Sequence, residues 1–435
     1  MPRKVLLHVG SPKTGTTFLQ QVLWSQRDLA REQGLLLPLG SFHDHFLASV
    51  DVRELSYEPR FPARAIGMWT RLVEEGQTWN GNVLVSHELF AATTAAQAVN
   101  AVAAWGDADV HVIVTARDLE RQIPAEWQEH LKHRAAVTFS DFVAELRERG
   151  PDASWFWTVQ DCAAVCRRWG AAVTADNIHL VTVPPRGSRP EALWERFAGL
   201  LGLDAGSFEL VWSRANSSLR AEQAELLRRV NAQLGDRLRL PGPYPETVKE
   251  ILAQDVLAGR DGARVALTGS NRDFAVERSV QMVDELRAQG VDVVGDLAEL
   301  APSTATVEPP GGVTEHPESI ADAVLLGEGV EAISGLLERL NEARTRARSR
   351  REQEAAQQAA QRVTRSELDA LAVEHQRLRG DHDHLLDDLR TRPLRRALIA
   401  MAERRTALMR LRVAYWRVVN VGRRLRRLAG GRENA

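Results

Sequence analysis

Short runs of apolar, largely β-branched residues alternate with longer segments of helical periodicity from the start of the chain to about residue 235. The apolar runs predict strands at residues 5–9, 35–37, 82–86, 110–115 and 178–183. Between them, apolar residues spaced three and four apart predict helices at residues 16–33, 60–75, 95–105, 119–131, 139–149, 159–169 and 191–201. Nearly continuous apolar strands are typical of parallel sheets that are buried on both faces. The pattern therefore predicts an α/β domain with a parallel sheet covered by helices on both faces.

One edge of this sheet is the expected place for a ligand. In open parallel sheets, ligands bind outside the carboxyl ends of the strands. The residues that follow Val9, Ser86, Thr115 and Val183 are therefore the first candidates for a functional site.

The rest of the chain divides into a domain end, a linker and an extension. A helix is expected at residues 217–234, capped by Asn-Ser-Ser at 216–218, before a proline-rich stretch at 240–246 and a further α-rich stretch. Residues 301–319 are rich in Pro, Gly, Thr and Glu and have no apolar periodicity, which indicates a linker. We therefore expect an α/β domain at residues 1–300, a linker at 301–319 and a helical extension at 320–435.

The extension contains a short heptad seam at about residues 364–390, which predicts a coiled coil and self-association. Its positions are Leu368, Leu371, His375, Leu378, His382, Leu385 and Leu389. Gly380 weakens this seam, and Pro393 is expected to end it. Residues 393–430 then carry arginine on most helical turns, with Leu, Met, Val, Tyr and Trp between them. Such a basic amphipathic tail suits an anionic membrane surface or an acidic partner, but a solvated helix that packs on the core or self-associates is the simpler interpretation.

Composition indicates an ordinary soluble protein with an electrostatically distinct tail. The chain has 435 residues, of which 44% are hydrophobic and 26% charged, and its formal net charge is −2. From Arg390 onward there are fourteen arginines and only two acids, so the preceding part is acidic. With no secretory signal and no apolar run of membrane-spanning length, we expect a cytoplasmic protein, peripheral to the inner membrane if the tail binds lipid. We expect no nucleic-acid partner.

Two cysteines, Cys162 and Cys166, are the only ones in the chain and lie four residues apart on a predicted helix. A single pair of this kind argues against a disulfide framework and for a reducing compartment. A metal-binding pair is an alternative, but buried free thiols are the expected role.

A candidate phosphate-binding loop, Ser-Pro-Lys-Thr-Gly-Thr-Thr at residues 11–17, follows the first strand. A loop between a strand and a helix presents backbone N–H groups beside the positive end of the helix dipole. Gly15 permits a tight turn, Thr16 and Thr17 add hydroxyl donors, and Lys13 adds a mobile positive charge. In nucleotide-hydrolysing loops the lysine follows the second glycine, whereas here Thr16 takes that place. The motif predicts an anion site of another kind; a glycine-containing helix start without a ligand is the alternative.

These segments resemble sulfotransferases that use 3′-phosphoadenosine 5′-phosphosulfate as donor, in their bacterial branch. PKTGTT after a strand resembles their 5′-phosphosulfate loop, GNVLVSHELF the strand that carries the catalytic base, and VIVTARDLERQIPAEWQEHLKH the element that holds the 3′-phosphate. FWTVQDCAAVCRRWG and VVGDLAEL are similar to later segments, so the resemblance covers about residues 3–300. It implies a P-loop kinase-like sulfotransferase fold and in-line, metal-independent transfer of a sulfuryl group to an acceptor hydroxyl or amine.

The resemblance also implies donor-binding roles for Lys13, Thr14, Gly15, Thr16, Thr17, Arg117 and Arg121. Lys13 would lie over the bridging oxygen and neutralise the charge that develops on the leaving 5′-phosphate. Arg117, just after its strand, would hold the 3′-phosphate. A structural ion pair with an acid of the next helix (Asp118, Glu120 or Glu126) is the alternative for Arg117.

One departure from the family lies in the 3′-phosphate element. The family has a serine eight residues after the arginine, and this chain has Ala125 there. Arg121 or Gln122 could compensate for the missing hydroxyl.

Glu88 or His87 is the expected general base, because the acceptor hydroxyl must lose its proton as sulfur is attacked. Strand side chains alternate, so these two should point to opposite sides. The resemblance favours Glu88, with His87 as the close alternative; a carboxylate that caps a helix near residues 91–94 is another role for Glu88. His8, inside the first strand, is expected to be a hydrogen-bonded core histidine.

The acceptor leaves almost no trace: a saccharide, a lipid headgroup, a glycopeptide or a small metabolite would all fit. Several tryptophans could line a cleft, although large aromatic residues more often fill cores; they are Trp69, Trp79, Trp127, Trp155 and Trp157. Two other functions compete. A nucleotide-dependent kinase would need Mg²⁺, for which Asp118 could be proposed, and a lysine after Gly15. A degenerate nucleotide-binding scaffold would act through its helical tail.

Overall fold

The chain forms two compact units, Met1–Leu340 and Asn341–Ala435. A computed structural model describes residues 2–58, 60–210, 218–238, 240, 242–301, 312–391, 397 and 406–429. Of the predicted helix cap at 216–218, only Ser218 lies within the described residues.

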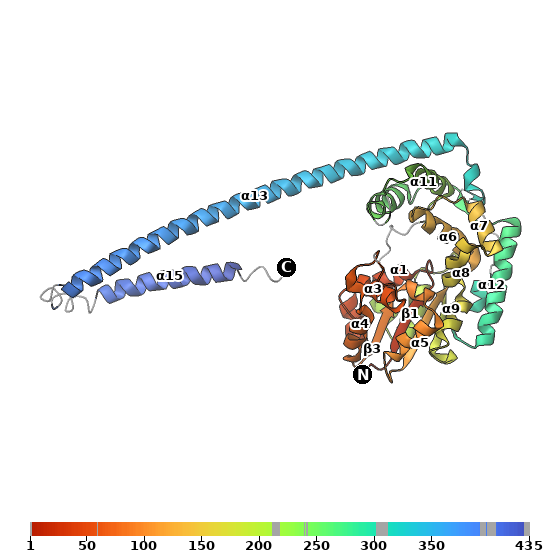
Figure 1. Cartoon of the computed structure of the whole chain (residues 1–435), viewed down its shortest axis with the longest axis horizontal. Coiled ribbons are helices and arrows are strands. Elements are labelled where there is room, and N and C mark those ends of the chain that lie inside the picture. Colours follow the sequence, from red (N-terminus) through yellow and green to blue (C-terminus); the bar gives the residue numbers. More distant parts are fainter. Residues whose placement is uncertain are drawn as a thin grey trace. The chain divides into compact units, whose positions relative to one another are not determined.

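A six-stranded sheet in the order β2-β3-β1-β4-β5-β7 lies at the centre of the first unit, and every neighbouring pair of strands is parallel (Figure 1). The strands are β1 (Val5–Gly10), β2 (Leu35–Leu36), β3 (Asn82–Ser86), β4 (Val110–Ala116), β5 (Ile178–Thr182) and β7 (Asp292–Val294). The five strands expected from the apolar runs are therefore all present, and the α/β class is confirmed. The strand β7 was not predicted, because three residues beginning with an aspartate carry too little apolar pattern.

Both faces of the sheet are buried. Along β1, Val5, Leu7 and Val9 belong to one hydrophobic cluster, whereas Leu6 belongs to a second. Successive strand residues point to opposite faces, so apolar side chains leave the sheet on each side. This double burial explains why the strands are nearly continuous apolar runs.

Helices connect and cover the strands. They are α1 (Thr16–Ser25), α2 (Arg27–Glu32), α3 (Phe42–Val52), α4 (Met68–Gln77), α5 (Ala95–Ala103), α6 (Leu119–Lys132), α7 (Phe139–Glu148), α8 (Ser154–Gln160), α9 (Cys162–Trp169), α10 (Ala192–Leu201), α11 (Ala221–Leu234), the π-helix η7 (Pro245–Leu257) and α12 (Gly269–Gln289). The helix α6, which follows β4, is packed against α7, α11 and α12 (Figure 1). α6 is therefore covered by several helices where it follows β4.

Three predicted helices begin later or are divided. The helix expected at 16–33 breaks at Gln26 (φ −127°) into α1 and α2. The helix expected at 60–75 begins only at Met68, because Gly67 before it adopts a left-handed conformation (φ 71°). The helix expected at 159–169 is divided at Asp161, which caps α9 by accepting a hydrogen bond from the Ala164 N–H (2.9 Å).

The predicted core residues are in the core. Trp127 is fully buried, Trp69 and Trp157 are 8% exposed, and Trp79 and Trp155 pack against the same cluster. The interpretation of these rings as core filling is therefore confirmed. The two cysteines are free and buried on α9, and burial raises the pKa of Cys162 to about 12.

The domain boundary differs from the predicted one, because residues 312–340 belong to the first unit. Within the predicted linker, β8 (Val313–Thr314) pairs in parallel with β6 (Arg264–Val265), and the short 3-10 helix η9 (Pro317–Ser319) follows it. Residues 302–311 lie outside the described part of the chain.

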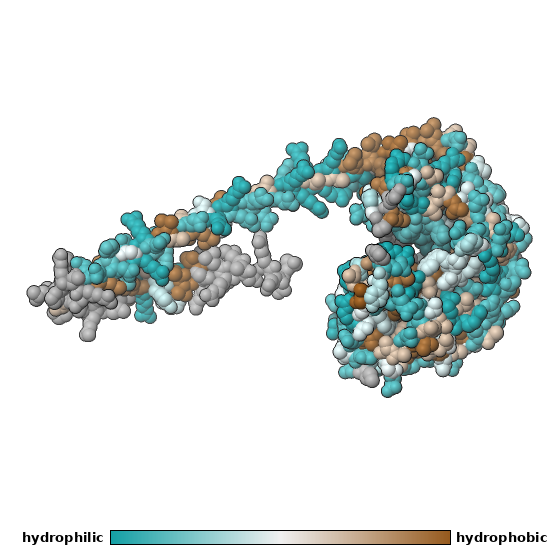
Figure 2. Space-filling view, viewed as in Figure 1, coloured by the Kyte–Doolittle hydropathy of each residue, from teal (hydrophilic) through white to brown (hydrophobic). Residues whose placement is uncertain are grey.

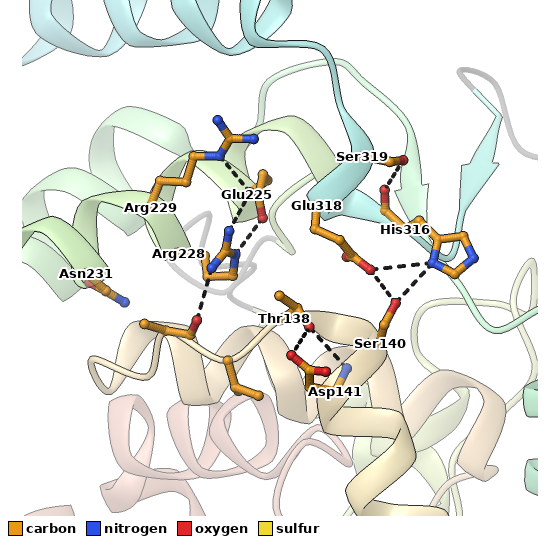
Figure 3. A network of polar contacts seen from close by, with 12 residues as sticks. Thr138, Ser140, Asp141, Glu225, Arg228, Arg229, Asn231, His316, Glu318 and Ser319 are labelled. Atoms are coloured by element: carbon orange, nitrogen blue, oxygen red, sulfur yellow. Dashed lines mark hydrogen bonds and ion pairs between the residues drawn. The ribbon is translucent and has the colours of Figure 1, made fainter.

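Polar contacts hold this segment against α7 and α11. Figure 3 shows Ser140 of α7 in contact with His316 and Glu318, with 3.0 Å between Ser140 Oγ and His316 Nδ1. On α11, Arg229 binds Asp322, just after this segment, at 2.7 Å, and the buried Glu225 of the same helix holds both Arg229 and Arg228 (Figure 3). Because these contacts are made by polar side chains and a two-residue strand, they leave no apolar periodicity in the sequence.

The second unit contains α15 (Ala407–Ala429) and the greater part of α13 (Asp322–Thr391). The helix α13 continues through Gly380, and the described seam leucines Leu368, Leu371, Leu378 and Leu385 are 46–65% exposed. Figure 2 shows mainly hydrophilic residues along most of α13, and a brown hydrophobic patch at the start of the helix, where Leu326, Val330, Ile333 and Leu337 are exposed. Pro393 lies outside the described residues, and the coiled coil stays a prediction. In the described part of the chain, no helix combines the length and the apolar character that crossing a bilayer requires.

Candidate functional site

The loop between β1 and α1 brings three left-handed residues together. Gly10 (φ 103°), Lys13 (φ 62°) and Gly15 (φ 88°) all have positive φ, which is uncommon for a lysine. A Cβ on Gly10 would lie 2.9 Å from the Cα of Glu88, so only glycine lets the end of β3 approach the loop this closely. Gly15 ends the loop, and among the described residues no side chain caps the start of α1.

The three loop threonines have different surroundings. Thr14 is buried and its hydroxyl donates to the carbonyl oxygen of Ser11 at 2.5 Å. Thr16 is also buried, while Thr17 is exposed at the first turn of α1. The first N–H groups of a helix have no acceptor within the helix, so this end can offer backbone donors, and Thr17 a hydroxyl, to an anion.

A chain of buried polar side chains runs below the loop. His8 lies between Ser86 on β3 (Nδ1 to Oγ, 2.7 Å) and Thr115 on β4 (Nε2 to Oγ1, 3.3 Å), and Thr115 contacts the hydroxyl of Thr14 at 2.5 Å. Burial, and next the nearby His87, lower the pKa of His8 to about 3. His8 is therefore a neutral, hydrogen-bonded core histidine, as predicted, and it links two strands to the loop.

His87 and Glu88 lie beyond β3, which ends at Ser86: His87 caps the 3-10 helix η2 (Glu88–Ala92), and Glu88 begins it, so strand alternation does not apply to them. The Nδ1 of His87 accepts a hydrogen bond from the Leu89 N–H (3.2 Å), its ring stacks on Phe42 of α3 (5.3 Å), and burial lowers its pKa. Glu88 lies beside Gly10, and its buried Oε2 has no hydrogen-bond partner within the described residues. The cap of α5 is Thr94 rather than Glu88. Of the two candidate bases, Glu88 is thus the one beside the loop with an unsatisfied oxygen.

Arg117, at the end of β4, is turned toward the first turns of α6. Its Nε donates to Gln122 Oε1 (2.8 Å) and its Nη2 to the Arg121 carbonyl (3.0 Å). Burial, and next the charge of Arg121, lower the pKa of Arg117 to about 10. The alternative ion pair is not found among the described residues, since Asp118 pairs with Arg121 and Glu120 with Arg272.

Arg121 connects α6 to the chain segment that follows β5 through hydrogen bonds. Besides Asp118, it donates to the carbonyl oxygens of Pro184 (2.8 Å) and Val183 (3.2 Å). Asp118 also caps α6 by accepting from the Arg121 N–H (2.8 Å), so both of its oxygens are engaged. The guanidinium of Arg121 is therefore less open to a ligand than was expected.

Two glutamine side chains hold the loop: Gln122, which was considered above as a substitute for the missing hydroxyl, and Gln160, which was not predicted. Gln122 donates to the Pro12 carbonyl at 2.5 Å, and Gln160 of α8 donates to the same oxygen at 3.3 Å. Since Gln122 also contacts Arg117, it connects the loop with the candidate 3′-phosphate residue. Of the two residues considered as substitutes at Ala125, Gln122 contacts Arg117 through its side chain, whereas Arg121 does so only through its backbone carbonyl.

Arg186 was also missed. Arg186 lies in the loop after β5. Partial burial of its guanidinium, and next the charges of Arg264 and Arg121, lower its pKa. This interaction places several arginines near the carboxyl ends of β4 and β5. The signal that could have found Arg186 is its position just after Val183, one of the four strand ends singled out above.

Lys13 contacts a carboxylate in the structure. Its Nζ lies 2.7 Å from Oε2 of Glu129 on α6, and the other oxygen of Glu129 lies 2.9 Å from Lys249 Nζ and 3.0 Å from His133 Nε2. Burial alone would raise the pKa of Glu129, but the His133 hydrogen bond and the charges of Lys13 and Lys249 lower it well below its ordinary range. Glu129 is therefore ionised and holds the Lys13 side chain, which is 33% exposed, beside the loop.

Comparisons with known proteins add little to this geometry. No protein-family model and no curated protein matches the sequence. One solved structure to which the chain is similar is a sulfotransferase from Alicyclobacillus acidocaldarius, with 16% identity and a TM-score of 0.32. The match covers 47% of this chain and 82% of that one. A likeness at this level carries no conclusion about function.

The arrangement itself can bind anions at two points of one sheet edge. The loop after β1 offers a helix start and Lys13, and the end of β4 offers Arg117, which still has unused N–H donors. Glu88 lies next to the loop, and one of its carboxylate oxygens has no hydrogen-bond partner among the described residues. In the described part of the chain, no group of three or more His, Cys, Asp or Glu residues is placed to hold a metal ion.

Proposed function

We propose that the chain is a sulfotransferase that uses 3′-phosphoadenosine 5′-phosphosulfate as donor. The observation that carries the proposal is the convergence of three motif residues on three adjacent strands. Lys13 follows β1, Glu88 follows β3 and Arg117 follows β4, and β1 lies between the other two strands in the sheet. Together with the family resemblance of these segments, this convergence supports a P-loop kinase-like sulfotransferase fold.

In this proposal the loop binds the 5′-phosphosulfate and Arg117 binds the 3′-phosphate. The bond between sulfur and the bridging oxygen breaks while a bond from the acceptor oxygen to sulfur forms, and the electron pair stays on the leaving phosphate. The Lys13 ammonium leaves Glu129, binds the bridging oxygen and neutralises the negative charge that develops on this oxygen. A donor placed in this way typically contributes about 3–4 kcal/mol to transition-state stabilisation.

Glu88 acts as the general base and removes the proton from the hydroxyl of the acceptor substrate. An unsatisfied, buried carboxylate oxygen beside the loop suits this role, because a general base must be within hydrogen-bond reach of the proton that it removes. His87 is the weaker candidate, since its ring is stacked on Phe42 and its Nδ1 already accepts a backbone hydrogen bond.

The competing function is a nucleotide-dependent kinase, and calorimetry distinguishes the two. The full chain is titrated with 3′,5′-adenosine bisphosphate without metal and, separately, with ATP and Mg²⁺. We expect the bisphosphate to bind, and to bind at least tenfold more weakly to Lys13→Ala and Arg117→Ala. The matched controls Lys4→Ala and Arg287→Ala, which change an exposed lysine and an exposed arginine elsewhere, should bind normally. Binding of ATP with Mg²⁺ and not of the bisphosphate would overturn the proposal.

A further inference from the structure

The chain contains 56 lysines and arginines, of which only four are lysine: Lys4, Lys13, Lys132 and Lys249. Two of these four, far apart in sequence, bind the carboxylate of Glu129, and a third, Lys132, follows Glu129 by three residues on the same helix. Lys13 comes from the loop, Lys132 from the end of α6 and Lys249 from η7, and Lys13 and Lys249 bind opposite oxygens of Glu129. A lysine ammonium is a compact charge with three donors that can be shared among the oxygens of an anion.

Lys132 shows that this lysine cluster has more positive charge than its own acid can balance. The residue is only 6% exposed, and no hydrogen bond or ion pair of its ammonium is found among the described residues. Burial, and next the charges of Lys13 and Lys249, lower the pKa of Lys132 to about 8, although the charge of Glu129 acts in the opposite direction. A charge that is largely withdrawn from water and has no partner in the protein is costly, so an anion at this site would stabilise it.

Along α6, the cluster lies toward the opposite end from the candidate 3′-phosphate site. Along α6, the Arg117 contacts are at residues 121 and 122, and Gln122 also holds the Pro12 carbonyl of the loop. Lys132 is eleven residues beyond Arg121, or about 16 Å along the helix axis at 1.5 Å per residue. A nucleotide held between Arg117 and the loop would leave this end of α6 to the second substrate.

We propose that Lys132 and Lys249 form a subsite for an oxyanion carried by the acceptor, next to the hydroxyl that receives the sulfuryl group. This inference rests on the proposed function and narrows its substrate class to acidic acceptors, such as a carboxylated, sulfated or phosphorylated saccharide or metabolite. With Lys13 engaged by the donor, Lys132, Lys249 and Glu129 leave a net charge of +1, which matches one acidic group. Partial exposure of Lys249 (25%) and Glu129 (21%) leaves the subsite open to solvent.

Equilibrium dialysis of radiolabelled inorganic phosphate tests the subsite in the full chain. The protein is first saturated with 3′-phosphoadenosine 5′-phosphosulfate, which fills both the loop and the position of the sulfuryl group. Phosphate bound in addition then reports an anion site outside the donor. We expect saturable binding that falls at least tenfold in Lys132→Met and in Lys249→Gln, and that is unchanged in Lys4→Met.

Three results separate the outcomes. Donor affinity within about twofold of the wild type in Lys132→Met, with unchanged or raised thermal stability, supports a ligand role, because loss of an unpartnered buried charge should not destabilise the fold. Donor binding without additional phosphate binding, or phosphate binding that Lys132→Met leaves intact, overturns the subsite and leaves the proposed function standing. Failure of the donor to bind overturns the proposed function, and the acceptor assignment with it.

Discussion

Replacement of His8 by glutamine should reduce the loss of folding stability that the α/β unit undergoes when the pH is lowered. His8 is fully buried between Ser86 and Thr115, and its pKa falls from 6.5 to about 3 on folding. The folded state therefore holds it neutral, whereas the unfolded chain takes up a proton as the pH falls below 6.5. Stability is thus fully present above pH 6.5 and is lost progressively from there down to about pH 3.

The size of the effect follows from the two pKa values. At pH 5, about 1.5 pH units below the unfolded pKa, the loss from His8 alone is about 2 kcal/mol at 1.36 kcal/mol per unit. His45, whose pKa is lowered to about 4 mainly by burial, adds a similar loss that the variant keeps. We expect the wild type to lose about 2 kcal/mol more than His8→Gln between pH 7.5 and pH 5.

Urea unfolding followed by tryptophan fluorescence at both pH values measures this difference. At pH 7.5 the variant should already be less stable by about 1–3 kcal/mol, because the hydroxyls of Ser86 and Thr115 each lose one hydrogen-bond partner and keep only Gln20 and Thr14. The control His382→Gln changes a histidine of α13 whose side chain is 58% exposed, and it should behave as the wild type. An equal pH-dependent loss in wild type and His8→Gln would refute the reasoning.

Other parts of the structure give further expectations. Gly10→Ala should destabilise the fold by about 2–4 kcal/mol in thermal melting, through both backbone strain and contact with Glu88. Gly34→Ala, which also has positive φ but nothing within 4 Å of an added Cβ, should cost only about 1 kcal/mol, and equal losses would contradict the close-approach argument. Glu225→Gln should lower the free energy of unfolding in urea by about 1–3 kcal/mol, because Arg228 and Arg229 lose a buried carboxylate; no change would mean that water replaces it. We also propose that the basic tail binds anionic membranes: the full chain should sediment with phosphatidylserine vesicles at low salt and be released at high salt, and a variant that lacks residues 341–435 should not bind. Salt-independent binding, or equal binding by the shortened chain, would contradict this role, and sedimentation velocity on the same pair tests self-association through residues 364–390.

Strands of this fold could be predicted because their chemistry is local. Residues of a doubly buried parallel strand are apolar almost without exception, so the run at residues 82–86 was found with the bounds that the structure gives. The ends of helices were harder to predict from the sequence, since they depend on single residues such as the left-handed Gly67 and the capping Asp161. The boundary at residue 300 failed because β8 is held by pairing and polar contacts with distant segments.

In the candidate site too, residues whose position depends on local sequence could be predicted, and contacts between distant residues could not. The loop and Arg117 follow apolar strands directly, so position along the chain was enough to select them. The partner of Lys13 could not be predicted, because Glu129 is 116 residues away and Lys249 lies another 120 residues beyond it. The use of Thr14 and Arg121 inside the protein was likewise hidden, since a sequence does not show whether a polar group faces a ligand or a neighbouring carbonyl.

A binding cycle between protein side chains and ligand phosphates tests the central claim most directly. The dissociation constants of 3′,5′-adenosine bisphosphate, adenosine 5′-monophosphate and adenosine 3′-monophosphate are measured for the wild type, Lys13→Ala and Arg117→Ala. A charge-assisted hydrogen bond is worth about 1.5–3 kcal/mol, or about ten- to 150-fold in affinity. The account predicts that Arg117→Ala removes the advantage of the 3′-phosphate, and Lys13→Ala that of the 5′-phosphate, each without affecting the other. Equal losses for all three ligands, or no loss with either variant, would contradict the assignment of these two anion sites.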